Sequence, residues 1–230
     1  SATSSAGGSD LTISLQLKDG AGAGDTTTSS GEVALFASGG SIAISSDTVS
    51  NDGALTAAWT PPTTPGTVTV WATVDGLALS SSASVTVVAG PASASTSTVS
   101  ADRFVVPANG SSTSIVTVVL RDQYGNPLSP TADSETVGFS ASGGGSVTST
   151  GTKAASGYYT GTFTAPATPG TSVVTATVGG APLGAVTVTS TQVTARLEHS
   201  TVTPSSSTFI AGGSDIEITV QLKSGASTSL

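Results

Sequence analysis

Few side chains in this sequence could act as acids, bases, nucleophiles or metal ligands. Its 230 residues include a single histidine and no cysteine, and only 9% of them are charged. Without cysteine, a thiolate nucleophile and a thiolate metal site are both excluded. The histidine, His199, follows Glu198, but neighbouring residues of a strand point to opposite faces and cooperate poorly as an acid–base pair. We therefore expect a protein that is not an enzyme.

The remaining candidates for metal binding are carboxylates near predicted turns. Calcium takes roughly six to eight oxygen ligands, often from several carboxylates of one loop. The sequence has no D-x-D-x-D-G loop, and an aspartate beside glycine commonly bonds its own backbone within a turn. We expect no cofactor. Calcium is the alternative, with Asp102 and Asp122 as its first ligands, on the expectation that both lie near one end of the same repeat.

Trp71 is the candidate for ligand binding. Its neighbours Val70 and Ala72 follow the buried phase of an alternating segment, so the indole is expected to point outward. The matching position of a second, similar segment is Thr175, which agrees with an outward position. An exposed tryptophan is a common anchor for proteins or sugars. The alternative is that a neighbouring loop or module covers Trp71.

The charge of the chain limits its partners. It carries 6 Lys and Arg against 14 Asp and Glu, a net charge of −8, and the cations are scattered. Nucleic acid is disfavoured as a partner, because binding it needs clustered cations. Membrane insertion is not expected, because no apolar run approaches the ~18 residues that it needs. The composition is rich in Thr, Ser, Gly and Val and poor in Lys and Glu, which indicates an extracellular protein of the bacterial cell surface.

The elements that must position these side chains come from an internal repeat. AGGSDLTISLQLKDGA begins at residue 6, ANGSSTSIVTVVLRDQYG at residue 108 and AGGSDIEITVQLKSGA at residue 211. We expect a repeat that lacks its first strand at residues 1–88, a complete repeat at 94–190 and the opening strands of a third at 194–230. Both ends of the chain fall at the same phase of the repeat.

Nearly every segment of the repeats alternates apolar and polar residues with a period of two, which predicts strands. Val116, Val118 and Leu120 share one face, for example, and turn signals such as Thr168-Pro169-Gly170 separate the segments. About seven short strands in ~100 residues are typical of an immunoglobulin-like sandwich. We therefore predict an all-β chain of tandem immunoglobulin-like β-sandwiches, with about seven strands each.

Two motifs of the middle repeat carry a family resemblance. The first is the D-x-x-G-N-P loop, Asp122 to Pro127, and the second is the aromatic–Thr–Ala–Pro–x–Thr–Pro–Gly turn that starts at Phe163. With them, the middle repeat resembles the bacterial immunoglobulin-like repeats of group 1, which occur in tandem in invasin- and intimin-type adhesins. The first repeat departs from the pattern, because Asp19 to Gly24 replaces the loop and lacks Asn-Pro.

The resemblance implies stalks, spacers and receptor-binding tips on bacterial surfaces, and some related arrays bind calcium at module junctions. We predict a non-catalytic structural and adhesive stalk segment whose short linkers, 88–92 and 190–193, restrict the angles between modules. Its partners would be neighbouring repeats and a host or surface protein or glycan. One alternative is a self-assembling fibre or surface-layer subunit in which copies share strands. The other is a carbohydrate- or protein-binding module that uses Trp71.

Overall fold

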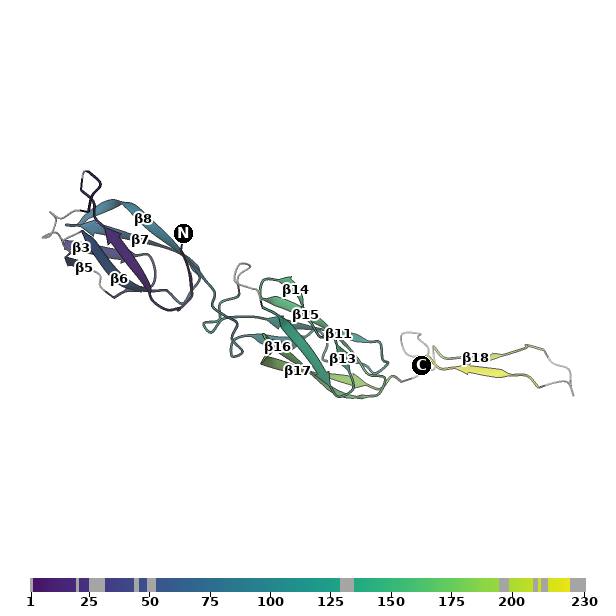
Figure 1. Cartoon of the computed structure of the whole chain (residues 1–230). Helices are drawn as coiled ribbons and strands as arrows, with labels where there is room; N and C mark the ends of the chain where they lie inside the picture. The colour runs from purple at the N-terminus through teal and green to yellow at the C-terminus, as the bar shows by residue number, and fades with distance from the viewer. Residues whose placement is uncertain are drawn as a thin grey trace.

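The computed structural model of the protein describes residues 2–19, 21–24, 32–43, 46–48, 53–128, 135–194, 199–208, 211 and 215–223. Within these residues every regular element is a β-strand. None of the described residues forms a helix long and apolar enough to cross a membrane. Two β-sandwiches lie end to end, and a two-stranded hairpin follows them (Figure 1). The predicted class, all-β with tandem immunoglobulin-like sandwiches, is confirmed.

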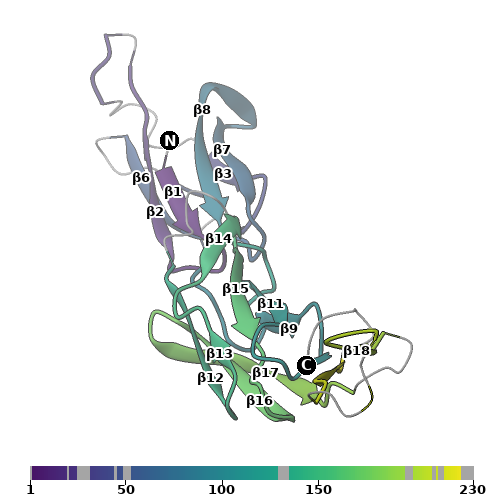
Figure 2. The same ribbon diagram turned by 90° about the vertical axis from the view of Figure 1, so that its right-hand side faces the viewer.

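The first sandwich contains two sheets, of strand order β1-β8-β7-β3-β5 and β2-β6-β4. Its strands are β1 (Ala2–Ser5), β2 (Leu11–Gln16), β3 (Glu32–Ala37), β4 (Ser41–Ile42), β5 (Ser46–Thr48), β6 (Ala54–Thr60), β7 (Gly66–Val74) and β8 (Leu77–Val88). Figure 2 shows the β2–β6 layer facing the layer of β3, β7 and β8. Strand β1 runs parallel to the end of β8, which ties the start of the described chain to the strand that leaves the sandwich.

The second sandwich repeats this plan with sheets of order β10-β17-β16-β12 and β13-β15-β11-β9, and β14 pairs with β15. Its strands are β9 (Thr98–Ala101), β10 (Val105–Pro107), β11 (Thr113–Val119), β12 (Val137–Ser142), β13 (Ser146–Val147), β14 (Thr152–Ala155), β15 (Tyr158–Thr164), β16 (Gly170–Val178) and β17 (Ala181–Thr191). Strand β10 is parallel to β17, as β1 is to β8. Short strands such as β13 bring the number of described strands above the seven expected.

The hairpin of β18 (Thr201–Pro204) and β19 (Ile218–Gln221) copies the pairing of β9 with β11. Pro204 faces Ile218 in the hairpin, as Ala101 faces Val116 in the second sandwich. The apolar side chains of the hairpin are exposed, and Val202 is 68% exposed. The hairpin therefore has the register of the opening strands of a further sandwich.

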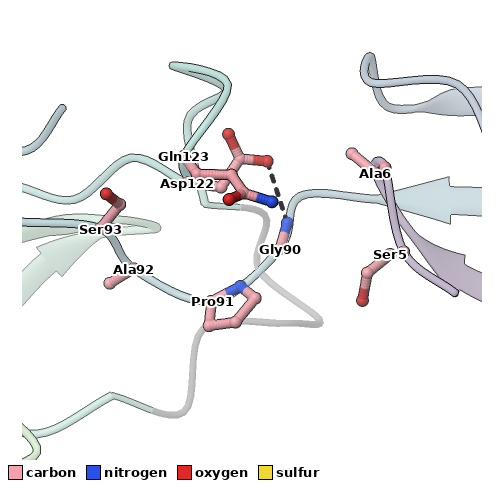
Figure 3. A pocket seen from close by; sticks show the side chains of 10 residues that line it. Ser5, Ala6, Gly90, Pro91, Ala92, Ser93, Asp122 and Gln123 are labelled. Atoms are coloured by element: carbon pink, nitrogen blue, oxygen red, sulfur yellow. Dashed lines mark hydrogen bonds between the residues drawn. The ribbon is translucent and has the colours of Figure 1, made fainter. Parts of the chain in front are cut away.

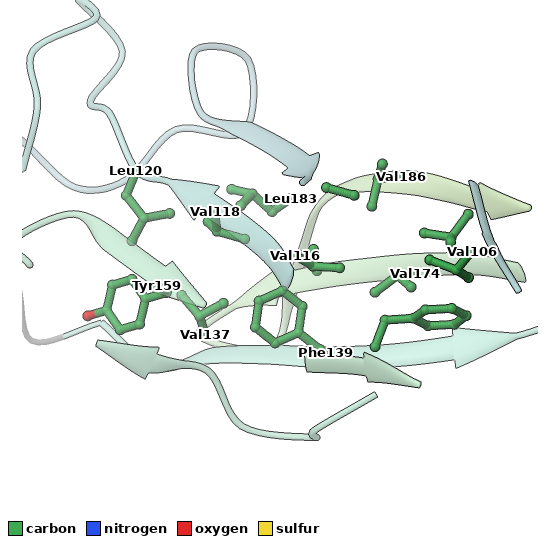
Figure 4. Close-up of a cluster of buried hydrophobic side chains, with 14 of the residues drawn as sticks. Val106, Val116, Val118, Leu120, Val137, Phe139, Tyr159, Val174, Leu183 and Val186 are labelled. Atoms are coloured by element: carbon green, nitrogen blue, oxygen red, sulfur yellow. The ribbon is translucent and has the colours of Figure 1, made fainter. Parts of the chain in front are cut away.

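The core of the second sandwich is continuous and lies between its sheets (Figure 4). Val116, Val118 and Leu120 are fully buried, as their alternation predicts, and Phe163 packs among them at 0% exposure. In the first sandwich Trp59 takes the corresponding place, and its indole N–H donates to the Gly39 carbonyl at 2.9 Å. Burial of these alternating apolar residues stabilises each sandwich without a disulfide.

Candidate functional site: the joint between the sandwiches

The loop from Asp122 to Pro127 follows β11 and faces the first sandwich. One carboxylate oxygen of Asp122, Oδ1, accepts the backbone N–H groups of Tyr124 and Asn126, each at 2.9 Å. Gly125 closes the turn by donating to the Asp122 carbonyl at 2.9 Å, with a φ of +83° that favours glycine. The aspartate and the glycine of the D-x-x-G-N-P motif are therefore there to build the turn.

The second carboxylate oxygen of Asp122 leaves the loop and holds the linker. Oδ2 accepts the backbone N–H of Gly90 at 3.0 Å and the side-chain amide of Asn126 at 2.8 Å. Figure 3 shows the bond to Gly90 beside the hollow between the sandwiches. Asp122 is 0% exposed. Burial alone would raise the pKa of its carboxyl, but the hydrogen bonds from Asn126, Gly90 and Tyr124 outweigh burial and hold the pKa below its ordinary value.

Two side chains of the loop reach the first sandwich. The Asn126 amide donates to the Thr63 carbonyl at 2.8 Å. The Tyr124 ring covers Gly7, with its hydroxyl 3.5 Å from the Gly7 carbonyl oxygen. A side chain at Gly7 would overlap that ring. This contact between the sandwiches therefore combines one firm hydrogen bond with an aromatic ring packed on bare backbone.

The linker itself is bound on both sides of Gly90. Ala6 donates its N–H to the Val88 carbonyl at 2.7 Å, and Ser93 donates to the Arg121 carbonyl at 2.8 Å. Between these points Ala89 is buried. A hollow of about 330 Å³ remains beside the linker. Its lining comes from Ser5, Ala6, Gly7, Gly8, Gly90, Pro91, Ala92, Ser93, Asp122 and Gln123.

The structure does not bring the two candidate calcium ligands together. Asp102 accepts the Ser114 hydroxyl at 2.8 Å and the Ile115 N–H at 2.7 Å, near the start of β11. These bonds, led by that of Ser114, and the nearby charge of Arg103 hold the pKa of Asp102 below its ordinary value. Asp122 follows the other end of β11. The sequence-based expectation that both lie near one end of the sandwich is wrong, because β11 spans the distance between them.

Both oxygens of the Asp122 carboxylate face N–H donors, an arrangement that satisfies an anion without a cation. Among the residues that the structure describes, no three or more Asp, Glu or His side chains gather as a metal site would require. Glu198, the neighbour of His199, lies outside the described residues. Calcium binding stays a prediction.

Trp71 lies on β7 and stacks on Phe36 of β3. The ring centroids are 5.7 Å apart and the planes meet at 14°. The two residues face each other across the strands, and Ser140 and Thr175 form the same pair in the second sandwich. Trp71 is half-buried, and Phe36 is 41% exposed. A role for Trp71 in ligand binding stays a prediction, and Phe36, its partner, was not singled out from the sequence.

Sequence reasoning also missed Tyr124, Asn126 and Gly7 as contacts between the sandwiches. The motif was interpreted as a turn, which needs only the aspartate and the glycine. A signal was available in the comparison of the repeats, because Ala21 and Ala23 stand where the second loop has Tyr124 and Asn126. Side chains larger than a turn requires indicate a contact outside the turn.

Two sandwiches of the same topology, joined through a loop and a bound linker, define a tandem array of immunoglobulin-like modules. The family model "Invasin, domain 3" matches residues 1–90 and 93–195. The chain therefore belongs to the invasin domain 3 family. The two matched ranges meet at the linker that Asp122 holds.

Solved structures agree on the fold. The Escherichia coli adhesin FdeC is 24% identical to this chain with a TM-score of 0.64, and the match covers 96% of this chain and 70% of that one. Yersinia pseudotuberculosis InvD is 19% identical with a TM-score of 0.58, and the match covers 99% of this chain and 69% of that one. A comparison with curated protein sequences gives no match.

Proposed function

We propose that this chain is a non-catalytic segment of an adhesive stalk on a bacterial cell surface. The observation that carries the proposal is the joint, in which Asn126 and Tyr124 of one sandwich contact the end of another. Modules joined in this way extend a protein along one axis. Membership of the invasin domain 3 family and the fold shared with the FdeC adhesin support the surface role.

The strand topology suits a load-bearing segment. In the second sandwich β10, which follows the first strand, β9, is a parallel neighbour of the leaving strand, β17. Tension that reaches β10 along the chain from β9 pulls β10 and β17 in opposite directions, so that their hydrogen bonds are loaded together in shear. The first sandwich has the same arrangement in β1 and β8. We infer that each module resists extension through this pair.

The test is made on cells that express the whole protein. Antibodies raised against this chain should label intact bacteria, and brief protease treatment of the cells should remove the label. Antibody fragments should also reduce attachment of the bacteria to host cells or to a coated surface. Label that appears only after the cells are lysed would contradict the proposal.

A second candidate function, strand sharing between copies, is favoured by a hollow in the first sandwich. In the second sandwich β9 lies beside β11, and Val99 packs over Gly184 of β17. The first sandwich has a hollow of about 180 Å³ at the matching place, lined by Leu15 and Leu79 among others. No strand of the described residues pairs with that edge of β2.

Strand β18 has the residue that would fill this hollow. Val202 corresponds to Val99 through the shared hairpin register. A β18 strand from another copy could add to β2 with Val202 inside, as strands add to open sheet edges. Light scattering over a concentration series should then show growing mass for the parent chain and less for a Val202→Ser variant. A Thr203→Ser variant is the matched control, and a parent that stays monomeric throughout would exclude this candidate.

A further inference from the structure

The two sandwiches share one loop turn but use it differently. We propose that Tyr124 and Asn126 fix the orientation of the preceding module, and that their partner is a module end carrying a bare glycine and a free carbonyl, as at Gly7 and Thr63. The inference rests on the proposed stalk function for its biological meaning, but its physical claim concerns this chain alone. Two side chains of one loop, Tyr124 and Asn126, would then determine how stiff a joint is.

The turn itself does not distinguish the sandwiches. Asp19 Oδ1 accepts the N–H groups of Ala21 and Ala23, each at 2.9 Å, as Asp122 does two and four residues further along its own loop. Gly22 donates to the Asp19 carbonyl at 3.0 Å and has a φ of +84°. Since both loops make the same turn, the turn does not explain the larger residues of the second.

Asn126 explains one of the two large residues. Its side-chain amide has two N–H groups, and one donates to Thr63 of the first sandwich while the other donates to Asp122. Both partners accept, which fixes the orientation of the amide. Asp122 also holds the linker at Gly90. One connected set of bonds therefore joins the first sandwich, the loop and the linker, and Ala23 could make none of its side-chain bonds.

Tyr124 explains the other large residue, through the backbone that it covers. Gly7 has a φ of +57° and donates its N–H to the Pro62 carbonyl at 2.9 Å. Any side chain there would overlap the Tyr124 ring. The glycine thus serves both the turn and the contact. An aromatic ring on bare backbone opposes sliding and rotation of one sandwich on the other, because both motions bring the ring against neighbouring residues.

The far end of the second sandwich presents the same kind of surface. Gly110 has a φ of +73° and donates to the Pro166 carbonyl, as Gly7 does to Pro62. Among the described residues, the only atom within 4 Å of a side chain built on Gly110 is the Ala167 Cβ, at 3.8 Å. The surface at Gly110 is therefore open to an aromatic ring from a further module.

The third repeat lacks the side chains that would cover Gly110 in the way that Tyr124 covers Gly7. The register of β18 with β19 places Ala226 at the position of Tyr124 and Thr228 at that of Asn126. Both residues lie outside the described part of the chain. We infer that the first joint is fixed and that the second joint, before the hairpin, is free of this restraint.

Spin labels can test the two joints in the whole chain. The chain has no cysteine, so each introduced pair is the only one. Thr56→Cys with Thr162→Cys spans the first joint, and Thr162→Cys with Thr203→Cys spans the second; all three positions are exposed. Pulsed dipolar spectroscopy should give a narrow distance distribution across the first joint. Tyr124→Ala and Asn126→Ala should each broaden it at least about twofold, because relative motion is the default where a domain interface is small.

Control measurements separate effects on the joint from effects on folding. Phe104→Ala removes an exposed aromatic at the other end of the second sandwich and should leave the width unchanged. Gly7→Ala should broaden the distribution in the parent but add nothing in the Tyr124→Ala background. Tryptophan fluorescence reports the first sandwich alone, since Trp59 and Trp71 both lie there, and shows whether it remains folded.

Two outcomes would overturn the inference. One is an unchanged width across the first joint in both loop variants, with both sandwiches folded. The other is a distribution across the second joint as narrow as that across the first. Because the measurement uses purified chain, its failure would leave the stalk function open, and absence of the protein from the cell surface would leave this result standing.

Discussion

Asp19 and Asp122 occupy the same position in two copies of one loop, and their surroundings differ. Each aspartate closes its turn with two backbone bonds of 2.9 Å. Asp19 is exposed, whereas Asp122 is completely buried and accepts two further bonds, from Gly90 and from Asn126. The same turn thus serves as a surface loop in one module and as a joint in the other. Turn formation and module contact are therefore separate properties of the motif.

The largest contrast is expected from removing the two carboxylates. Asp122→Ala should lower the free energy of unfolding of the second sandwich by about 2–4 kcal/mol, because it leaves several partly buried N–H groups without an acceptor. Asp19→Ala should cost the first sandwich about 1 kcal/mol or less, because water replaces the lost acceptor. Denaturant unfolding gives both values. Tryptophan fluorescence follows the first sandwich, and near-ultraviolet circular dichroism of the three tyrosines, all in the second, follows the other.

Equal losses of stability in the two sandwiches would contradict the comparison, because the burial of Asp122 would then have no effect on the free energy of unfolding. Asp122→Asn sharpens it further. The amide keeps the size of the side chain but presents N–H groups toward N–H donors, so this variant should be destabilised to a similar extent. A stable Asp122→Asn variant would show that shape, not charge, holds the linker.

The two cores offer a second contrast, for which we expect a slightly smaller change in stability. Phe139 packs over Gly161 in the second sandwich, where the first has Leu35 and Ala57. A Cβ on Gly161 would lie 2.8 Å from the Phe139 ring. Gly161→Ala should therefore cost about 1–3 kcal/mol through overpacking. Adding Phe139→Leu should recover most of that loss, because the smaller side chain leaves room for the added methyl group. A double variant less stable than Gly161→Ala would contradict this explanation.

The fold could be predicted from the sequence because its signals are local and repeated. Alternation in residues such as Val116 and Val118 depends only on the pleat of a strand, and each repeat supplies an independent copy of the signal. The strand pattern and the burial of Val116, Val118 and Leu120 followed from this. The exposure of Val202 did not follow, because alternation identifies the inner face but not whether the opposing sheet is present.

The joint could not be predicted in the same way, because it depends on residues far apart in sequence. Asn126 contacts Thr63, 63 residues away, and Tyr124 contacts Gly7, 117 residues away. No periodicity connects such positions. The separation of Asp102 from Asp122 was also out of reach, since it requires knowing which end of β11 each one lies beside. What the sequence did contain was the difference between Ala21 and Tyr124 at matching positions.

A third contrast concerns the outer faces of the sandwiches. Phe36 and Trp71 form the cross-strand pair that Ser140 and Thr175 form in the second sandwich. Stacked aromatic pairs contribute about 0.5–1.5 kcal/mol beyond the area that they bury. Trp71→Thr should therefore lower the stability of the first sandwich by roughly that amount. Denaturant unfolding followed by the fluorescence of Trp59, which the variant retains in the core of that sandwich, measures the loss.

The same variant tests the predicted ligand role. If Trp71 anchors a glycan or a protein, Trp71→Thr should abolish binding to a glycan array or to host-cell extract while the sandwich stays folded. Binding that is equal in parent and variant would assign the stack to stability alone. Thr175→Ala is the matched control on the second sandwich, because it changes the same register position without an aromatic ring.

The last contrast is between neutral and acid pH, and it isolates the charge on Asp122. The pKa of Asp122 in the folded chain lies below its ordinary value of 3.8, because hydrogen bonds to the carboxylate outweigh its burial. A depressed pKa means that the ionised group stabilises the fold above that ordinary value, and the stabilisation is lost as the pH falls through the folded pKa. Urea unfolding of the second sandwich should therefore give a stability that declines below about pH 4. Asp122→Asn, which does not titrate, should be less stable than the parent at neutral pH and approach it in acid. Asp102 is present in both proteins, so its own depressed pKa cancels from the difference. A gap between parent and variant that stays constant into acid would contradict this prediction, because the two side chains have the same size and only that of the parent titrates.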